Sequence, residues 1–258
     1  MTVKEDAASL AVIFRMTTIP YKEATQMPTC IFIDSGAVCL GGILGALLGR
    51  RLDEALKATL NRIFGLCSIA IGVISLTHTQ TLPALVLSVV LGSLAGTLLL
   101  LERRVTALAA PLGGRLSGGG AFSSADADRL ISVLVLFCAS GTGIFGAIQY
   151  GATGDGSVLL AKSILDFFTA AIFASSLGLA VSAIGLPQCL ILCALYLCGP
   201  LLMRVSPAVA LEDFTACGGV LMLATGLKIT GICSFPLMDM LPALVCVIPI
   251  STLWNVLF

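Results

Sequence analysis

Long apolar segments dominate this chain and restrict it to a membrane fold. Of its 258 residues, 58% are hydrophobic and only 11% carry a charged side chain. A soluble domain has about 25% charged residues, because its surface must face water. A membrane-spanning helix instead needs roughly 20 mostly apolar residues in succession. The chain therefore predicts an all-α polytopic bundle of transmembrane helices, with much of its surface facing lipid.

Eight apolar segments are long enough to cross a bilayer as helices. The predicted spans are 30–49, 59–76, 82–101, 130–149, 158–184, 186–203, 214–232 and 237–257. Only Gly185-Leu-Pro187 divides the fifth from the sixth, and a proline removes a backbone donor and bends or ends a helix. Seven spans therefore remain an alternative, in which these two segments form one bent or re-entrant unit.

Basic residues are concentrated in two of the predicted loops. Eight of the fourteen lysines and arginines follow the first and third spans: Arg50, Arg51, Lys57, Arg62, Arg103, Arg104, Arg115 and Arg129. When the spans alternate in direction, these two loops lie on the same side of the membrane. Because cytoplasmic loops carry an excess of Lys and Arg, this side is expected to be the cytoplasm.

Two stretches differ from the apolar pattern. Residues 1–26 contain an apolar run too short to span a bilayer, and no convincing cleavage site follows it. We expect a mobile N-terminal extension before a single transmembrane domain, 27–258. Residues 102–129 are rich in Gly and Ser, which is typical of a flexible linker. We expect this cytoplasmic linker to join the two halves of the domain.

A weak internal similarity suggests that the two halves are related. Leu82-Pro-Ala-Leu85 opens the third span, and Leu241-Pro-Ala-Leu244 lies early in the eighth. Phe64-Gly-Leu-Cys67 in the second span resembles Phe214-Thr-Ala-Cys217 in the seventh. Related segments are five spans apart, so the two units would have opposite orientations. This pattern predicts inverted repeats of three spans around a central pair, a transporter-like plan; chance similarity between Leu- and Ala-rich helices is the alternative.

An acidic residue, Asp166, lies deep in the fifth span. If this helix begins near Val158, the carboxylate is about 12 Å from its start at 1.5 Å per residue. An ionisable group at this depth is costly without a partner or a water-filled cavity, so such residues mark functional sites by default. Lys162, one helical turn earlier, can pair with it or extend its ammonium group to the membrane surface.

Two hydroxyl residues continue this polar face along the fifth span. Thr169 and Ser176 fall with Lys162 and Asp166 in a stripe roughly 80° wide. Asp166 could then bind a cation or a proton, and the hydroxyls would extend a polar path. The alternative is an internally neutralised Lys–Asp pair that only fixes helix packing.

The fourth span contains a second polar feature, Ser140-Gly-Thr-Gly143, with Gly146 close behind. Each glycine weakens a helix by about 1 kcal/mol, and freed backbone groups are tolerated where they are buried in protein or line a cavity. We expect Ser140, Gly141, Thr142 and Gly143 to contribute to an ion or solute path. The alternative is a small-residue face for close helix packing.

Asp155, between two glycines just before the fifth span, has an ordinary explanation as a capping or turn residue. A role at the vestibule of the path is the alternative.

Several classes of function find no support in the sequence. Lysines and arginines balance aspartates and glutamates at 14 each, without a basic block, so no nucleic-acid partner is expected. The ten cysteines form no Cys-x-x-Cys pair, and neither a cofactor nor a metal site is expected. A serine hydrolase needs a base such as histidine near its serine, and nothing in the sequence indicates that the one histidine, His78, lies near Ser140. Asp155 and Asp166 are about 16 Å apart along one helix, too far to share a proton. We therefore expect no enzyme, and an intramembrane hydrolase is the least favoured class.

Two central motifs carry a resemblance to a known family. Ser140-Gly-Thr-Gly-Ile-Phe-Gly146 and Ala161-Lys-Ser-Ile-Leu-Asp-Phe-Phe-Thr-Ala170, with Gly154-Asp155 between them, resemble the YqgA-like (YdfK-like) bacterial membrane proteins, a family of unknown function. The resemblance extends from about residue 27 to the C-terminus. It implies a multi-pass protein of the bacterial inner membrane, often labelled as a transport protein, and it supplies no substrate or catalytic residue. Asp34 departs from the asparagine of that family pattern, which argues against an obligatory charge there.

These features favour a transporter or a channel-like protein for an ion or small solute. The polar path would lie at the fourth and fifth spans. Its partners are the lipid bilayer and the unknown ion or solute; homo-oligomerisation remains open. A membrane scaffold or sensor without transport is the alternative.

The basic loops generate a prediction on topology. In an otherwise cysteine-free protein in intact spheroplasts, a membrane-impermeant thiol reagent should label Thr79→Cys and spare Ser117→Cys, because the first faces outward and the second the cytoplasm. The opposite labelling pattern would reverse the orientation.

Overall fold

The computed structural model describes residues 27–48, 53–116, 124–233 and 235–257, and these residues form helices joined by short connections, without a strand. The helices are α2 (Thr29–Leu48), α3 (Glu54–Leu76), α4 (Leu82–Leu98), α5 (Leu101–Leu116), α6 (Ser124–Cys138), α7 (Gly141–Thr153), α8 (Ser157–Leu177), α9 (Ala180–Ala183), α10 (Gly185–Val205), α11 (Ala208–Ile229), α12 (Leu237–Met240) and α13 (Pro242–Leu257). The predicted all-α fold is confirmed. The extension predicted for 1–26 lies outside the described residues.

The membrane spans agree closely with those predicted. Within the described ranges, seven helical segments are long and apolar enough to cross a membrane, and the bent pair α4–α5 makes an eighth if it counts as one span. Large apolar side chains such as Leu47, Leu98 and Val245 are exposed on the outer surface. Contact with lipid removes these side chains from water. The chain is a multi-pass helical membrane protein.

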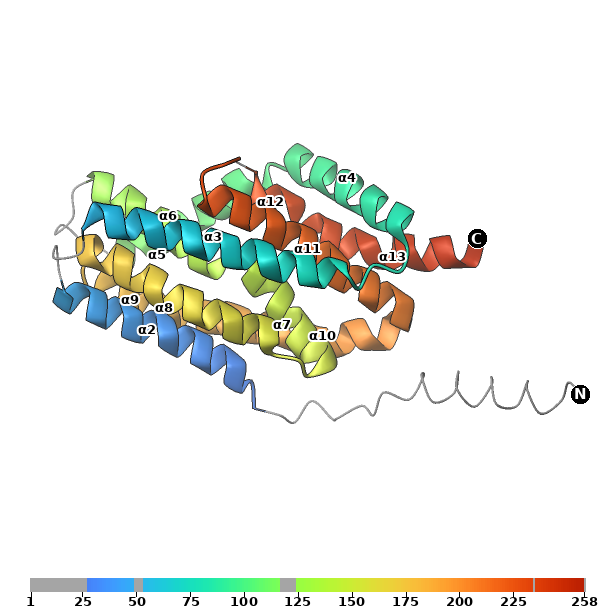
Figure 1. Cartoon of the computed structure of the whole chain (residues 1–258), viewed down its shortest axis with the longest axis horizontal. Coiled ribbons are helices and arrows are strands. Elements are labelled where there is room, and N and C mark those ends of the chain that lie inside the picture. The colour runs from blue at the N-terminus through green and yellow to red at the C-terminus, as the bar shows by residue number, and fades with distance from the viewer. Residues whose placement is uncertain (1–26, 49–52, 117–123, 234, 258) are drawn as a thin grey trace, which may run out of the picture.

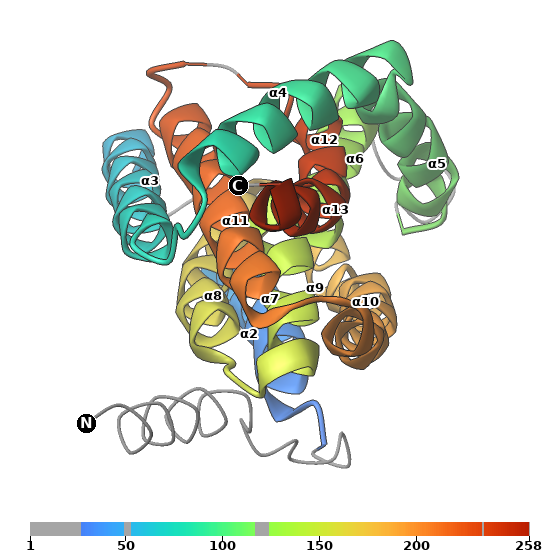
Figure 2. The same cartoon turned by 90° about the vertical axis from the view of Figure 1, so that its right-hand side faces the viewer.

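Most of the helices run along the long axis of the molecule (Figure 1). The start of α3 and the whole of α5, both of which carry basic residues, lie at one end. The C-terminus and the connection from α7 to α8 lie at the other end. In the end-on view, α11 and α13 are central, α3 and α4 lie outside them, and α2, α8, α7 and α10 form the opposite side (Figure 2).

Glycines bring the backbones of α3 and α11 into contact. A Cβ atom on Gly72 would lie 2.8 Å from the carbonyl oxygen of Gly219, and one on Gly226 would lie 2.5 Å from that of Gly65. Residue numbers rise along α3 as they fall along α11, so the two helices are antiparallel. In lipid the hydrophobic effect does not drive helices together, because the lipid tails are themselves apolar. The close approach of α3 and α11 instead provides dispersion contacts that stabilise the pair.

The antiparallel packing of α4 on α13 bears on the inverted repeat. Gly92 of α4 packs against Ala243, and Gly96 packs against Asp239 just before α13. Both Leu-Pro-Ala-Leu segments therefore lie near the start of antiparallel helices, and the second, with Ala243 on Gly92, is level with the interior of α4. Placement of the two segments at opposite membrane faces, and superposition of the two halves, stay predictions.

The predicted boundary between the fifth and sixth spans is wrong. Helix α8 ends at Leu177, and Gly178 follows with φ 68° and ψ −157°, a positive-φ conformation that glycine adopts without a Cβ clash. The next span begins at Ala180. Pro187 therefore lies within the sixth span, in the first turn of α10, where its missing N–H does not break the helix.

The linker predicted for 102–129 is wrong for most of its length. Helix α5 continues to Leu116 and α6 begins at Ser124; residues 117–123, with the three consecutive glycines, lie outside the described part. The axis of α5 bends by 55° from that of α4, at Leu100, whose φ is 51°. The Gly and Ser content suggested a coil, but the residues before Pro111 alternate apolar and polar with a helical period.

Close packing of α3 on α11 generates a second prediction. Gly226→Ala should lower the midpoint of thermal unfolding in detergent, because overpacking costs about 1–3 kcal/mol. Gly36→Ala is the matched control: Gly36 also lies in a helix, but nothing approaches its Cβ position within 4 Å, and the change should raise stability slightly. Equal midpoints for the two variants would contradict the close contact.

Candidate functional site

The parallel packing of α2 on α8 positions the charged residues of the site. A Cβ atom on Gly41 would overlap the backbone of Phe167, and one on Gly45 would overlap that of Ala171. The two glycines therefore let the helices approach at backbone distance. Asp34, two turns before Gly41, consequently faces the polar stripe of α8.

Four side chains form a buried charge cluster: Asp34 of α2, Lys162 and Asp166 of α8, and Gln188 of α10. The Lys162 Nζ atom donates to Asp34 Oδ2 at 3.0 Å and to Asp166 Oδ2. Gln188 Nε2 donates to the same two oxygens, at 2.7 Å and 3.1 Å. The side chains of Asp34, Lys162 and Asp166 are 0%, 4% and 13% exposed. Lys162 therefore points inward and does not extend to the membrane surface.

The charge cluster is not electrically balanced. Two carboxylates face one ammonium group, so the ionised cluster carries one excess negative charge. Taking charged groups out of water costs several kcal/mol per ion, which pairing repays only with good geometry and further hydrogen bonds. Gln188 supplies two of these bonds. Asp34 Oδ1 nevertheless has no hydrogen-bond partner among the described residues, although it is buried.

A break in the fourth span lies beside the charge cluster. Helix α6 ends at Cys138, and α7 begins at Gly141 with Ser140 as its N-cap. The Ser140 Oγ atom accepts a hydrogen bond from the backbone N–H of Gly143 at 3.1 Å, which satisfies one of the free donors of the new helix. A Cβ atom on Gly143 would lie 3.0 Å from Lys162 Cε, so glycine leaves room for the lysine.

A central cavity of about 490 Å³ connects these features. Its polar lining comes from helices far apart in the sequence: Asn61, Ser68, Glu102, Thr106, Ser132, Ser140, Thr142, Lys162, Asp166, Thr169, Thr225 and Lys228. The Lys228 Nζ atom lies 3.6 Å from Glu102 Oε1, and both side chains are partly exposed. The cavity thus extends from this pair, at the end of the bundle where α5 lies, to the buried Lys162.

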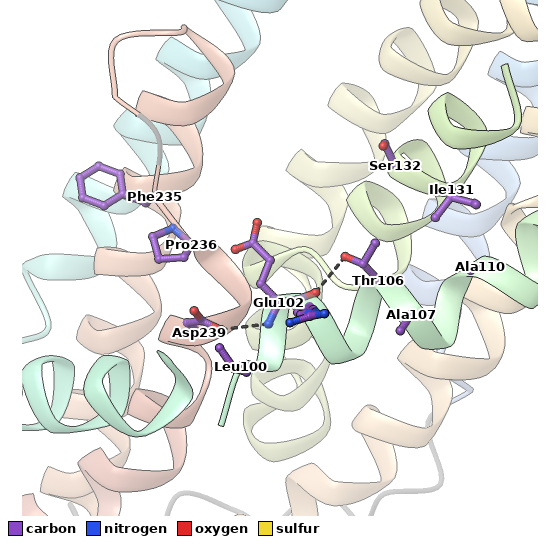
Figure 3. A pocket seen from close by; sticks show the side chains of 11 residues that line it. Leu100, Glu102, Thr106, Ala107, Ala110, Ile131, Ser132, Phe235, Pro236 and Asp239 are labelled. Atoms are coloured by element: carbon purple, nitrogen blue, oxygen red, sulfur yellow. Dashed lines mark hydrogen bonds between the residues drawn. The ribbon is translucent and has the colours of Figure 1, made fainter. Parts of the chain in front are cut away.

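A larger peripheral cavity, of about 880 Å³, adjoins the central one. It shares Glu102, Thr106 and Ser132 with the central cavity. Figure 3 shows the Glu102 carboxylate pointing into this space between Pro236 and Thr106. The backbone N–H of Glu102 donates to Asp239 Oδ1 at 2.9 Å, which fixes the start of α5 against α12.

The structure brings together most of the residues that the sequence predicts for the path. Asp166, Lys162, Thr169, Ser140 and Thr142 all line the central cavity. Gly141 and Gly143 are buried at the start of α7; Gly141 packs near Leu221, and Gly143 lies beside Lys162.

Two predicted residues lie elsewhere. Ser176 is exposed on the outer surface, and its hydroxyl donates to the Phe173 carbonyl of its own helix. Ser176 does lie on the same face of α8 as Thr169, since seven residues turn a helix by about 700°. The cavity lining on α8 nevertheless ends at Phe173, so assigning Ser176 to the path was wrong. Asp155 is exposed, and its Oδ1 atom accepts from the Ser157 N–H at 2.9 Å, so it has the ordinary turn role and does not line either cavity.

Asp34 and Gln188 are members of the cluster that the sequence does not single out. Asp34 was available as an acid in the first span, but its departure from the family pattern argued against an obligatory charge. In the structure, the Asp34 carboxylate forms an ion pair with Lys162. Gln188 follows the proline at which the sequence predicts a break between spans. Its place inside the bundle depends on the start of the sixth span at Ala180.

The charge cluster generates a third prediction. Lys162→Met should lower the unfolding midpoint strongly, because removing one partner of a buried pair costs about 3–5 kcal/mol. Adding Asp34→Asn and Asp166→Asn to Lys162→Met should restore much of the loss, since no buried charge is then left unpaired. A triple variant that is less stable than Lys162→Met would show that the ion pairs do not control stability here.

Comparison with known proteins agrees with the family resemblance. The chain is 46% identical over 229 residues to the uncharacterized protein YqgA of Escherichia coli (strain K12), covering 88% of this chain and 97% of that protein. It is 26% identical over 214 residues to the uncharacterized membrane protein YdfK of Bacillus subtilis (strain 168), covering 80% of this chain and 88% of that protein. No solved structure matches. The family profile described as "Protein of unknown function (DUF554)" matches residues 29–252, and the chain belongs to this family.

Proposed function

We propose that this protein transports an ion or a small polar solute across the bacterial inner membrane through the central cavity. The observation that carries the proposal is a polar cavity that reaches from the partly exposed Glu102–Lys228 pair to the buried Lys162 and Asp166. Its volume of about 490 Å³ lies within the range of small-molecule sites. In this proposal the protein moves its solute without catalysing a covalent reaction.

The broken fourth span supports a solute site in this cavity. Interrupted helices place backbone groups and a helix end near the membrane midplane, where transporters bind their substrates. The start of α7 meets this description, since Ser140 and Thr142 line the cavity next to Lys162. An interruption that only served packing would not need a cavity beside it.

The hydroxyl groups of the cavity favour a solute that donates hydrogen bonds or carries positive charge. Ser68, Thr106 and Thr225 donate their protons to the backbone carbonyls of Met222, Glu102 and Leu221. Each hydroxyl oxygen keeps a lone pair as an acceptor. A cation, an ammonium group or an amide N–H can use these acceptors.

The two ends of the cavity differ, which supports alternating access. Toward the α5 end, the lining includes the partly exposed Asn61, Glu102 and Lys228. Toward the other end, Tyr150 and Tyr196 pack with ring centroids 5.2 Å apart within a buried apolar cluster. Access from one side only is the arrangement that a carrier adopts in one of its states. With the basic loops in the cytoplasm, this state opens inward.

The proposal predicts which residue changes affect flux. A thermal-shift screen against cations, anions and metabolites should find a solute that raises the unfolding midpoint by mass action. In proteoliposomes, Asp166→Asn should lower uptake of that solute at least about tenfold, because a charge-assisted hydrogen bond is worth about 1.5–3 kcal/mol. Thr169→Ala should weaken uptake less.

Ser176→Ala is the matched control on the same helix, because Ser176 is exposed and lies outside the cavity. Its uptake should equal that of the wild type. Full uptake by a folded Asp166→Asn variant, or the absence of any stabilising solute, would favour a scaffold or sensor and contradict transport.

A further inference from the structure

We propose that Asp34 and Asp166 together bind one proton, and that this shared carboxyl pair is the proton-coupling site of the transporter. Its coupling role rests on the proposed function, whereas its proton binding does not. Both carboxylates direct their Oδ2 atoms at the same two nitrogens, Lys162 Nζ and Gln188 Nε2. Like charges held this close in a buried site cannot both stay ionised without cost.

The excess charge has no counter-ion within the cluster. Lys162 neutralises one carboxylate, and Gln188 contributes an amide dipole but no charge. Asp34 is fully buried, and its second oxygen, Oδ1, has no hydrogen-bond partner among the described residues. Gln188 is equally buried, and its Oε1 atom has no such partner either. A proton on the carboxyl pair removes the excess charge, and a neutral carboxyl group costs less to bury than a carboxylate.

A proton fits this site better than a metal cation. Hard cations need several oxygen ligands in one shell, but both Oδ2 atoms already accept from nitrogen donors. The ammonium group of Lys162 would also repel a metal cation at this position. Across the described residues, no group of three or more His, Cys, Asp or Glu side chains is arranged to hold a metal ion.

The surroundings supply few other charges to compensate the pair. Helices α3, α6 and α7 contribute the neutral Asn61, Ser132, Ser140 and Thr142 to the cavity wall. The thiol of Cys138 on α6 is close enough to interact electrostatically with Lys162 and Asp166. Farther along the cavity, Glu102 of α5 and Lys228 of α11 pair with each other. The excess negative charge therefore belongs to Asp34 and Asp166.

The proton step is simple to balance. A hydronium ion in the water of the central cavity gives its proton to a carboxylate oxygen: one O–H bond of the hydronium ion breaks, one carboxyl O–H bond forms, and a neutral water molecule remains. The net charge of the cluster changes from minus one to zero. Lys162 remains an ammonium ion throughout. Asp166 lines the cavity whereas Asp34 does not, so the proton enters and leaves through Asp166. Release to water reverses the same step.

Infrared spectroscopy of the purified full-length protein tests this proposal without any transported solute. Protonated carboxyl groups absorb separately from carboxylates, and the band can be followed from about pH 5 to pH 9, where ordinary Asp and Glu side chains stay ionised. The wild type should show one carboxyl band that disappears in a single titration step. Asp34→Asn should abolish it, because a balanced Lys162–Asp166 pair remains. Asp166→Asn should also abolish it, because Asp34 then pairs with Lys162 alone.

Asp155→Asn is the control, since this exposed turn residue should leave the band unchanged. Each charge-balanced variant retains one Lys–Asp pair, and size-exclusion chromatography verifies that both fold. A wild-type spectrum without a titrating band, or a band that survives in both variants, would overturn the proton site. A titrating band combined with uptake that does not respond to a pH gradient would keep the proton site and overturn its coupling role.

Discussion

Burial of the Lys162 ammonium group between two carboxylates is the interaction on which the site depends. An uncompensated charge at this depth would be expensive, so α2, α8 and α10 must bring Asp34, Asp166 and Gln188 to it together. Gly41 and Gly45 permit the approach of α2 to α8, and the glycine at position 143 leaves space for the lysine chain. Packing and electrostatics therefore constrain the same small set of residues.

The amino-acid sequence predicts the fold well because membrane burial leaves few alternatives. Each backbone group must be satisfied inside its own helix, so the apolar runs defined the spans to within a few residues. The errors came where a helix ends for a local reason. Gly178 ends α8 with a positive φ of 68°, and the glycine-free stretch before Pro111 forms a helix where a linker was expected.

The site was only partly accessible to sequence reasoning. Lys162 and Asp166 lie one turn apart on one helix, so their pairing follows from local periodicity. Asp34 is 128 residues from Lys162, and nothing in a single sequence says which helices meet. The same limit explains Ser176: periodicity defines a face of α8, but only the neighbouring helices decide how far along that face the cavity extends.

The buried cores indicate where the bundle can change its arrangement. One apolar core gathers mainly residues of α11, α12 and α13 with Leu85 of α4, and it also includes Phe145 of α7 and Val158 of α8. Two others gather residues of α2, α6, α7, α8, α9 and α10. The central cavity lies between these groups, with α3, α5, α11 and α12 on one wall and α6, α7 and α8 on the other. The groups are in contact where Phe145 of α7 packs on Phe214 and Gly218 of α11, and they are separated at the cavity. Close-packed cores resist deformation, whereas the walls of a cavity lose few contacts when they move. The charge cluster lies wholly within the second group, so a rearrangement at this boundary would expose or enclose Asp166 without breaking its bonds to Lys162 and Gln188.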